Sequence, residues 1–167
     1  MIKSPVKRIA LDSMLLVIAL MLSYLESFLP SVLPGFKLGL ANIVIMFIFF
    51  NYGKLDSIIV SIMRVIIISL LFGNIPALWF SLAGAVFAYG MLWFTLLIKK
   101  YLSYIGISIL CAAAHNTGQI CAAATVFSNA AFFKYLPLLL IFSIITGVIT
   151  GTILQIIGRY LPLKKLF

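Results

Sequence analysis

Apolar segments of about 20 residues follow one another along this chain, and short turns containing Pro, Gly, Asn or Lys separate them. Of the 167 residues, 65% are hydrophobic and only 9% are charged, a composition that water-soluble domains do not have. In a lipid bilayer every backbone polar group must be satisfied within the protein, so such segments form helices. The chain is therefore expected to be an all-α integral membrane protein.

Turn signals and segment lengths predict a bundle of six transmembrane helices that forms a single domain over residues 1–167. The predicted spans are about residues 9–29, 38–50, 55–72, 77–98, 104–127 and 135–157. The second span is too short to cross a bilayer as a straight helix, so part of the loop before it is expected to dip inward. In the last span, Ser143, Gly147 and Gly151 form a stripe of small residues that favours close contact with another helix.

Basic residues are distributed unevenly over the predicted loops. One face carries only Lys37 and Lys134, whereas the other carries Lys3, Lys7, Arg8, Lys54, Lys99, Lys100, Arg159, Lys164 and Lys165. Because Lys and Arg are enriched in cytoplasmic loops, both termini are predicted to be cytoplasmic. The chain is then a multi-pass protein of the cell membrane, and its net charge of +9 faces anionic membrane lipid rather than nucleic acid.

The predicted fifth span contains the only histidine of the chain, in the stretch CAAAHNTGQICAAA (111–124). His115, Asn116 and Gln119 are so spaced that a helix places them on one side. Polar side chains at this depth face protein or a water-filled cavity. Three of them exceed what one helix contact needs, which favours a binding site, and the alternative is a neutral imidazole that hydrogen-bonds across helices.

Arg64 lies near the middle of the predicted third span, where a charge costs at least about 2.5–3.5 kcal/mol. It either forms a structural ion pair, for which Glu26 is the obvious partner, or faces a ligand. We predict a substrate site that consists of Glu26, Asn42, Arg64, His115, Asn116 and Gln119, with rim positions at Lys37, Asn74 and Trp79. One cation and several amides suit a small-molecule ligand with a carboxylate, a phosphate or a polarised carbonyl.

The sequence lacks the signatures of catalysis and of metal binding. Its three acidic residues are spread over both predicted membrane faces and do not form a paired-carboxylate Mg²⁺ site. It has no Walker loop, no CxxC and no HExxH motif, and a lone histidine is a poor metal site. We therefore expect no enzyme activity, no catalytic residue, no cofactor and no metal.

Two segments, PGFKLGLANIV (34–44) and AHNTGQ (114–119), together with the arginine of the third span, resemble the Gx transporter family, often labelled heptaprenyl diphosphate synthase component I. That family is similar to the substrate-binding S components of energy-coupling factor (ECF) transporters. The resemblance covers essentially the whole chain, and KLGLAN with AHNTGQ is its most specific part. It implies an S-component-like bundle that binds a micronutrient-like molecule from outside.

The resemblance also implies partners, namely a transmembrane coupling subunit and two cytoplasmic ATPases that drive uptake. S components commonly dock through an Ala-x-x-x-Ala stripe in the first helix, and the nearest small stripe here is Ala19, Ser23 and Ser27. The function expected first is the substrate-binding subunit of an ECF-type importer for a micronutrient-like or isoprenoid- or quinone-precursor-like solute. The alternative is a non-catalytic membrane subunit that binds a quinone or a prenyl lipid in an isoprenoid or redox assembly.

Overall fold

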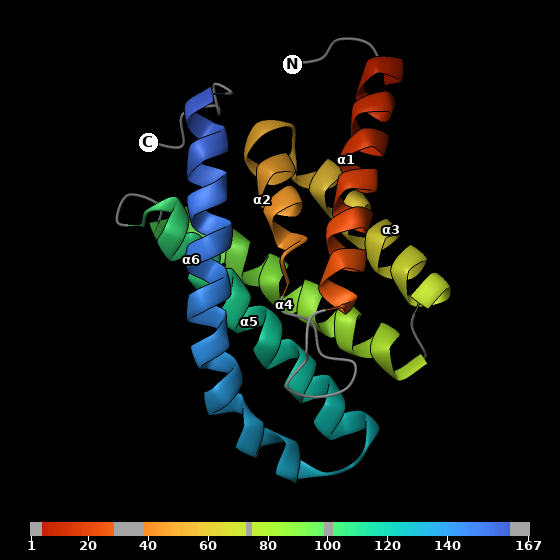
Figure 1. Cartoon of the computed structure of the whole chain (residues 1–167), viewed down its shortest axis with the longest axis vertical. Coiled ribbons are helices and arrows are strands. Elements are labelled where there is room, and N and C mark those ends of the chain that lie inside the picture. Colours follow the sequence, from red (N-terminus) through yellow and green to blue (C-terminus); the bar gives the residue numbers. More distant parts are fainter. Residues whose placement is uncertain (1–4, 29–38, 73–74, 99–101, 161–167) are drawn as a thin grey trace.

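The computed structural model of the chain describes residues 5–28, 39–72, 75–98 and 102–160 (Figure 1). These residues form the helices α1 (Pro5–Ser27), α2 (Asn42–Asn51), α3 (Lys54–Phe72), α4 (Ile75–Ile98), α5 (Tyr104–Val126) and α6 (Leu136–Tyr160), with a short 3-10 helix, η2 (Ala130–Tyr135), before the last. No β-strand occurs in this part of the chain. The predicted all-α fold with six helices is therefore confirmed.

Four segments are long and apolar enough to cross a membrane, namely Val6–Ser27, Lys54–Phe72, Ile75–Ile98 and Ala130–Tyr160. Large apolar side chains such as Leu70 and Val86 are exposed on their outer faces, as suits contact with lipid. The chain is thus a multi-pass membrane protein. Helix α5 has 23 residues, as many as α1, but it falls outside this group because the polar residues at its centre lower its hydropathy.

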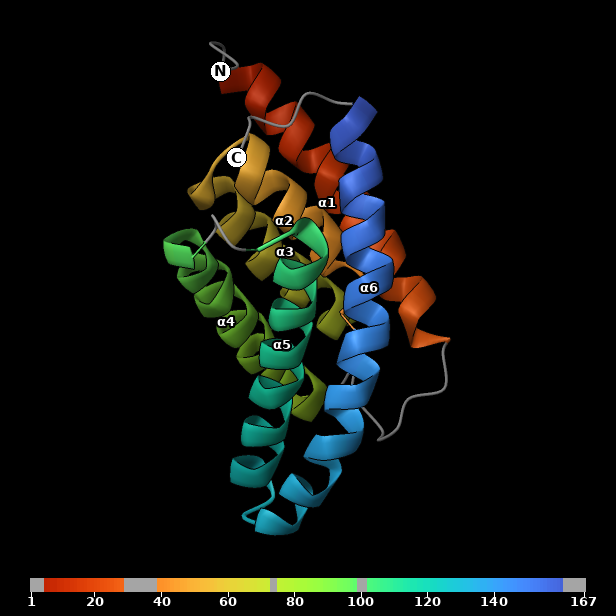
Figure 2. The same ribbon diagram turned by 90° about the vertical axis from the view of Figure 1, so that its left-hand side faces the viewer.

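The helices form two halves that meet where α3 packs on α4 and where α2 packs on α6. Helix α5 packs along α4 on one side and along α6 on the other (Figure 2), while α1, α2 and α3 form the second half. Helix α2 has only 10 residues, and its apolar side chains are buried nearly all round, among them Val44, Ile45 and Ile48. A helix that is apolar on every side is buried inside a protein or in a membrane. Helix α2 is about 15 Å long and so reaches across only half of a bilayer core. This agrees with the prediction that the second span is too short to cross a bilayer as a straight helix.

Glycines let the backbones of α4, α5 and α6 approach closely. A β-carbon at Gly118 of α5 would lie 2.6 Å from the carbonyl oxygen of Ala83 of α4. On the other side of α5, a β-carbon at Gly147 of α6 would lie 2.5 Å from the α-carbon of Ile109, and Gly151 makes a similar approach one turn later. Such distances exclude any larger residue unless the helices separate. The small stripe of the last span therefore faces α5, as predicted for a contact stripe.

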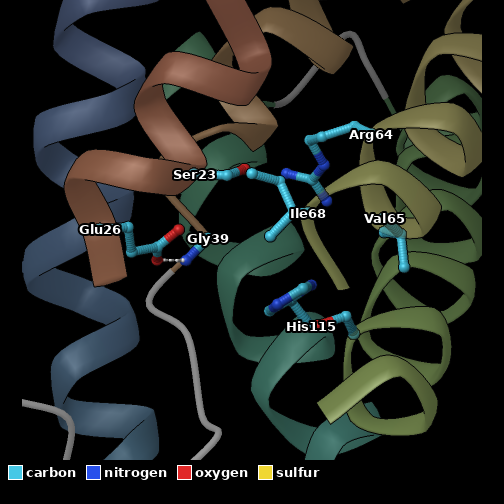
Figure 3. A pocket seen from close by; sticks show the side chains of 8 residues that line it. Ser23, Glu26, Gly39, Arg64, Val65, Ile68 and His115 are labelled. Carbon is cyan, nitrogen blue, oxygen red and sulfur yellow. Dashed lines mark hydrogen bonds between the residues drawn. The ribbon is translucent and has the colours of Figure 1, made fainter. Parts of the chain in front are cut away.

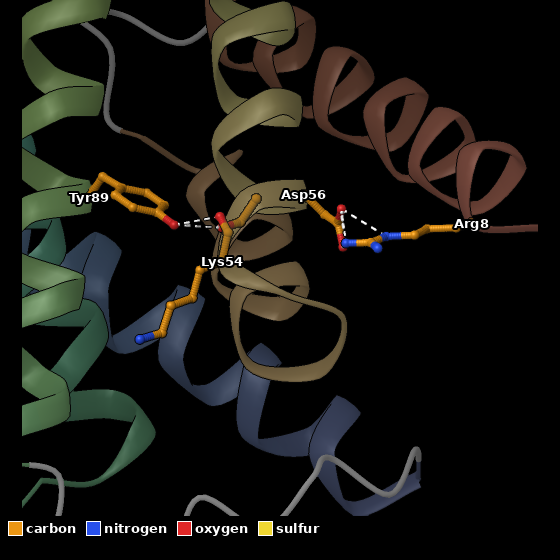
Figure 4. Close-up of polar contacts among 5 residues, drawn as sticks. Arg8, Lys54, Asp56 and Tyr89 are labelled. Atoms are coloured by element: carbon orange, nitrogen blue, oxygen red, sulfur yellow. Dashed lines mark hydrogen bonds and ion pairs between the residues drawn. The ribbon is translucent and has the colours of Figure 1, made fainter. Parts of the chain in front are cut away.

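An ion pair joins α1 to α3 at one end of the bundle (Figure 4). Arg8 donates from Nε and Nη2 to both carboxylate oxygens of Asp56 over 2.6–3.1 Å, and Asp56 is buried in the first turn of α3. Nearby, the Tyr89 hydroxyl donates to the carbonyl oxygen of Lys54 at 2.6 Å, which ties α4 to the same turn. The Lys54 ammonium in turn lies 3.7 Å from the centre of the Trp93 ring.

The first turn of α1 and the last turn of α6 lie at the same end of the molecule (Figure 1). This arrangement agrees with an even number of crossings. The assignment of that end to the cytoplasm stays a prediction from the distribution of basic residues.

Candidate functional site

A small internal cavity lies between α1, α3, α4 and α5, beside the residues that lead into α2 (Figure 3). Its lining consists of Ser23, Glu26, Gly39, Arg64, Val65, Ile68, Ser81 and His115. The volume of about 10 Å³ has room for about one water molecule. Three of the six predicted site residues, Glu26, Arg64 and His115, therefore meet at one place.

Arg64 provides the positive charge of this cavity. Its position on the buried stripe of α3, with Val60, Ser61 and Ile68, turns the side chain inward. The residue is only 5% exposed, and in the described part of the chain no hydrogen bond or ion pair engages its guanidinium. Glu26 attracts it electrostatically from the other side of the cavity. Arg64 is thus a buried cation whose hydrogen-bond donors face a cavity.

Glu26, in the last turn of α1, holds the chain segment that leads into α2. Its Oε1 accepts hydrogen bonds from the backbone N–H groups of Gly39 and Leu40. Gly39 has φ +86°, a left-handed conformation that favours glycine, and it is buried beside the His115 ring. The expected inward dip of the loop falls largely on residues 29–38, outside the described residues. Its described end at Gly39 does line the cavity.

His115 contacts a side chain of its own helix and a glycine of α4. The amide nitrogen of Gln119 lies 3.1 Å from His115 Nε2, and because an amide nitrogen only donates, Nε2 accepts. A β-carbon at Gly84 would lie 2.7 Å from His115 Cε1, so the ring packs directly on the α4 backbone. Gln119 is fully buried but does not line the cavity. It therefore orients His115 rather than facing the cavity itself.

Asn116 does not share the cavity with His115. Its Nδ2 donates to Ser143 Oγ at 2.7 Å and to the Leu139 carbonyl oxygen at 3.2 Å, both on α6. Consecutive residues of a helix point about 100° apart, which turns Asn116 to α6 while His115 turns to α4 and the cavity. The expectation that His115, Asn116 and Gln119 all point into one site is corrected accordingly. Asn116 fastens α5 to α6.

Asn42 lies at a second cavity, of about 20 Å³, next to the first. The lining of this cavity is mostly apolar and consists of Asn42, Ile45, Met46, Ser61, Ala85, Ala88, Tyr89, Leu92 and Cys111. Asn42 and Ser61 stand among apolar groups there. Of the six predicted site residues, three thus line the first cavity, Asn42 lines the second, Asn116 contacts α6, and Gln119 contacts His115.

The predicted rim lies mostly beyond the described chain. Lys37 and Asn74 are outside the described residues, and Trp79 is 56% exposed on α4 and does not line the cavity. Sequence reasoning missed Ser23 and Ser81 as lining residues. Ser23 had a signal, since it belongs to the small stripe of the first span. Ser81 stands three residues before Gly84, and its hydroxyl is buried with no hydrogen-bond partner in the described part of the chain.

Among the described residues, no group of three or more His, Cys, Asp or Glu side chains lies close enough to hold a metal ion. Chemically, the cavity offers one guanidinium, two serine hydroxyls, an imidazole and a carboxylate engaged by amides. Such a set binds and orients a polar group that accepts hydrogen bonds.

Comparison with protein families shows which family the chain resembles. The family described as "Heptaprenyl diphosphate synthase component I" matches residues 15–157, a range that includes all the residues that line the two cavities. Neither the curated proteins nor the solved structures give a match.

Proposed function

The chain belongs to the heptaprenyl diphosphate synthase component I family, and from this premise we propose that it is the substrate-binding membrane subunit of an ECF-type importer. Its ligand is a micronutrient-like or isoprenoid- or quinone-precursor-like solute. The site is the cavity of Arg64, and the ligand presents a carboxylate, a phosphate or a polarised carbonyl to it.

The observation that supports this function is that Arg64 is buried and forms no ion pair with the described residues. A guanidinium within the hydrocarbon region costs at least about 2.5–3.5 kcal/mol, and intramembrane charges of this kind mark ligand or ion sites. In many proteins an ion pair offsets the cost, but among the described residues Arg64 has none. A ligand that accepts hydrogen bonds would satisfy both the charge and the donors.

Binding without catalysis is the second part of the proposal. Prenyl transfer from a diphosphate requires carboxylates that gather Mg²⁺ ions. Glu26 is the single carboxylate at the cavity, and it already accepts two backbone N–H groups. Asp56 is engaged by Arg8 at the far end of α3. The word synthase in the family description therefore gains no support from these side chains.

The partners we propose are a coupling subunit and two cytoplasmic ATPases, since nothing in the sequence binds ATP. The first helix does not offer its small stripe to such a partner. Ala19 and Ser23 are buried within the bundle, where Ala19 packs against Val44 and Ile48 of α2. Docking would use another face of the helices.

A second candidate function is a non-catalytic subunit that binds a quinone or a prenyl lipid in an isoprenoid or redox assembly. The mostly apolar second cavity favours it, because such walls suit a ring or a hydrocarbon chain. The two functions differ in the path of entry. A water-soluble solute enters from outside, whereas a lipid enters between helices from the bilayer.

Native mass spectrometry of the purified protein tests the proposal by the small molecule that co-purifies with it. We expect a bound mass on the parent protein, its loss from the folded Arg64→Gln variant, and its retention by Arg159→Gln. Arg159 is exposed near the end of α6, so it is a matched control for removal of one arginine. If folded Arg64→Gln keeps the ligand, the arginine is structural and the proposed site is wrong.

A further inference from the structure

Five polar side chains line the cavity of Arg64, and none of them is more than 5% exposed. They come from the four helices α1, α3, α4 and α5, and they are Ser23, Glu26, Arg64, Ser81 and His115 (Figure 3). Buried polar groups in proteins almost always bond to the protein or to ordered water. Those of the five that the protein does not satisfy are therefore expected to find a partner in the cavity.

Two of these side chains have hydrogen-bonding groups that the described part of the chain does not satisfy. The Arg64 guanidinium makes no hydrogen bond or ion pair there, although a guanidinium carries several N–H donors. The Ser81 hydroxyl is buried without a hydrogen-bond partner among the same residues. A buried polar group that is left unsatisfied destabilises the folded protein. A molecule that accepts from Arg64 and also bonds to Ser81 would remove both costs.

The volume of the cavity limits the size of that molecule. The cavity measures about 10 Å³, which is room for about one water molecule. A group of several heavy atoms would fit only if the lining residues moved. For the arrangement of helices described here, the molecule is therefore the size of water.

The charges of the lining favour a neutral molecule over an ion. Glu26 and Arg64 carry opposite charges on opposite sides of the cavity, and no ion pair joins them. An anion next to Arg64 would also lie near the Glu26 carboxylate, which repels it. A water molecule can accept from the guanidinium, which only donates, and can donate to the carboxylate, which only accepts. Water thus suits both groups at once.

We propose that the cavity binds one ordered water molecule that joins Arg64 of α3, Glu26 of α1 and Ser81 of α4. Its oxygen accepts from the guanidinium, it donates to the carboxylate, and the Ser81 hydroxyl makes its third bond. A carboxylate has about four acceptor positions, and the backbone N–H groups of Gly39 and Leu40 take two of them. A bridging water is nearly as favourable in enthalpy as a direct hydrogen bond, so it links the three helices.

This water does not rest on the proposed function. The proposed function concerns the solute that would displace it from Arg64. The two proposals can therefore fail separately.

A crystal structure of the purified protein, grown from a lipid phase at a resolution that shows ordered water, tests the proposal directly. We expect one isolated density peak about 2.7–3.2 Å from a guanidinium nitrogen of Arg64 and at a similar distance from Ser81 Oγ. A cavity without a peak, or a direct ion pair between Arg64 and Glu26, would overturn the proposal.

Two further results of the same experiment would identify another occupant. Exchange of chloride for bromide in the crystals should produce no anomalous-scattering peak at this position, and a peak there would reveal an anion instead of water. Continuous density of several atoms would reveal a bound solute. That last result would overturn the water and support the proposed function.

A matched pair of serine variants tests the water in solution. Ser69 of α3 resembles Ser81, because its hydroxyl is also buried without a hydrogen-bond partner in the part of the chain that the structure describes, but it lines neither cavity. Removal of an unsatisfied hydroxyl relieves the cost of its burial, so Ser69→Ala should keep or raise the melting temperature in detergent. Ser81→Ala should lower it by about 2–4 °C, as expected for one lost hydrogen bond in a chain of this size.

The comparison of the two serine variants depends on the sign of the shift. A Ser81→Ala melting temperature equal to or above that of the parent would mean that the hydroxyl bonds to nothing, and the proposal would fail. If Ser81→Ala does not fold, the crystal structure of the parent protein still decides.

Discussion

Glu26 and Arg64 line the same cavity with opposite charges, and no ion pair joins them. The Glu26 carboxylate instead accepts the backbone N–H of Gly39 and so closes the end of α1 onto the segment before α2. Both side chains line the cavity, and the Glu26 carboxylate attracts the Arg64 guanidinium across it. The proposed function assigns Arg64 to ligand binding, and the predictions below test that role against a structural one.

Replacing Glu26 by glutamine should strengthen the binding of an anion. The amide oxygen of Glu26→Gln can still accept the N–H groups of Gly39 and Leu40, but the negative charge that opposes an anionic ligand is removed. We expect a several-fold higher affinity for methyl phosphate in calorimetric titration. A fall in affinity as large as that of Arg64→Gln would show instead that Glu26 itself binds the ligand.

Removing the charge of Arg64 should raise stability while it removes binding. A buried cation without an ion pair destabilises the folded protein, and functional groups often carry such a cost. The melting temperature of Arg64→Gln without ligand should equal or exceed that of the parent, with about 2–4 °C expected for each kcal/mol gained. A lower melting temperature together with unchanged binding would contradict a ligand-facing arginine.

The glycines between the helices should differ sharply in their tolerance of alanine. In Gly118→Ala and Gly147→Ala the new methyl group would overlap the backbone of a neighbouring helix, and we expect a loss of about 2 kcal/mol or more in stability. A β-carbon at Gly90, which is exposed on α4, would meet no atom within 4 Å, so Gly90→Ala should be neutral or stabilising by up to about 1 kcal/mol. Thermal unfolding in detergent measures all three, and equal effects would argue against the close helix contacts.

The two members of the Arg8–Asp56 pair should differ in what their loss costs. Arg8→Ala leaves a buried carboxylate without its partner, whereas Asp56→Ala leaves an arginine whose side chain is 49% exposed. Arg8→Ala should therefore destabilise the protein by more, by about 1.5–3 kcal/mol. Thermal unfolding of both single variants and the double variant gives the coupling energy. Independent, additive effects would show that the pair contributes nothing.

Both ends of the chain should lie on the cytoplasmic side of the membrane, as the basic residues predict. In a background without Cys111 and Cys121, a cysteine introduced as Lys7→Cys and one introduced as Tyr160→Cys should react with a membrane-impermeant maleimide in inverted vesicles and not in intact cells. Labelling of the two positions from opposite sides would exclude six crossings.

The sequence by itself determined the class of protein and most of its helices. Lipid offers no hydrogen-bond partner, so the backbone groups of each apolar segment must bond to each other within the segment. Each helix therefore follows from its local sequence and ends at a turn residue. The same logic marked Arg64 and His115 as inward-facing, because a charge or an imidazole does not face hydrocarbon. It also marked Gly147 and Gly151 as a helix contact.

Only the tertiary structure decided which polar residues share a cavity. The neighbours of α5 make that choice, since Gly84 and Gly118 bring α4 close on one side and Gly147 brings α6 close on the other. As a result His115 faces the cavity and Asn116 faces α6. Spacing along a helix gives the angle between two side chains but not what each one meets. That depends on contacts between segments far apart in the chain, which no local pattern records.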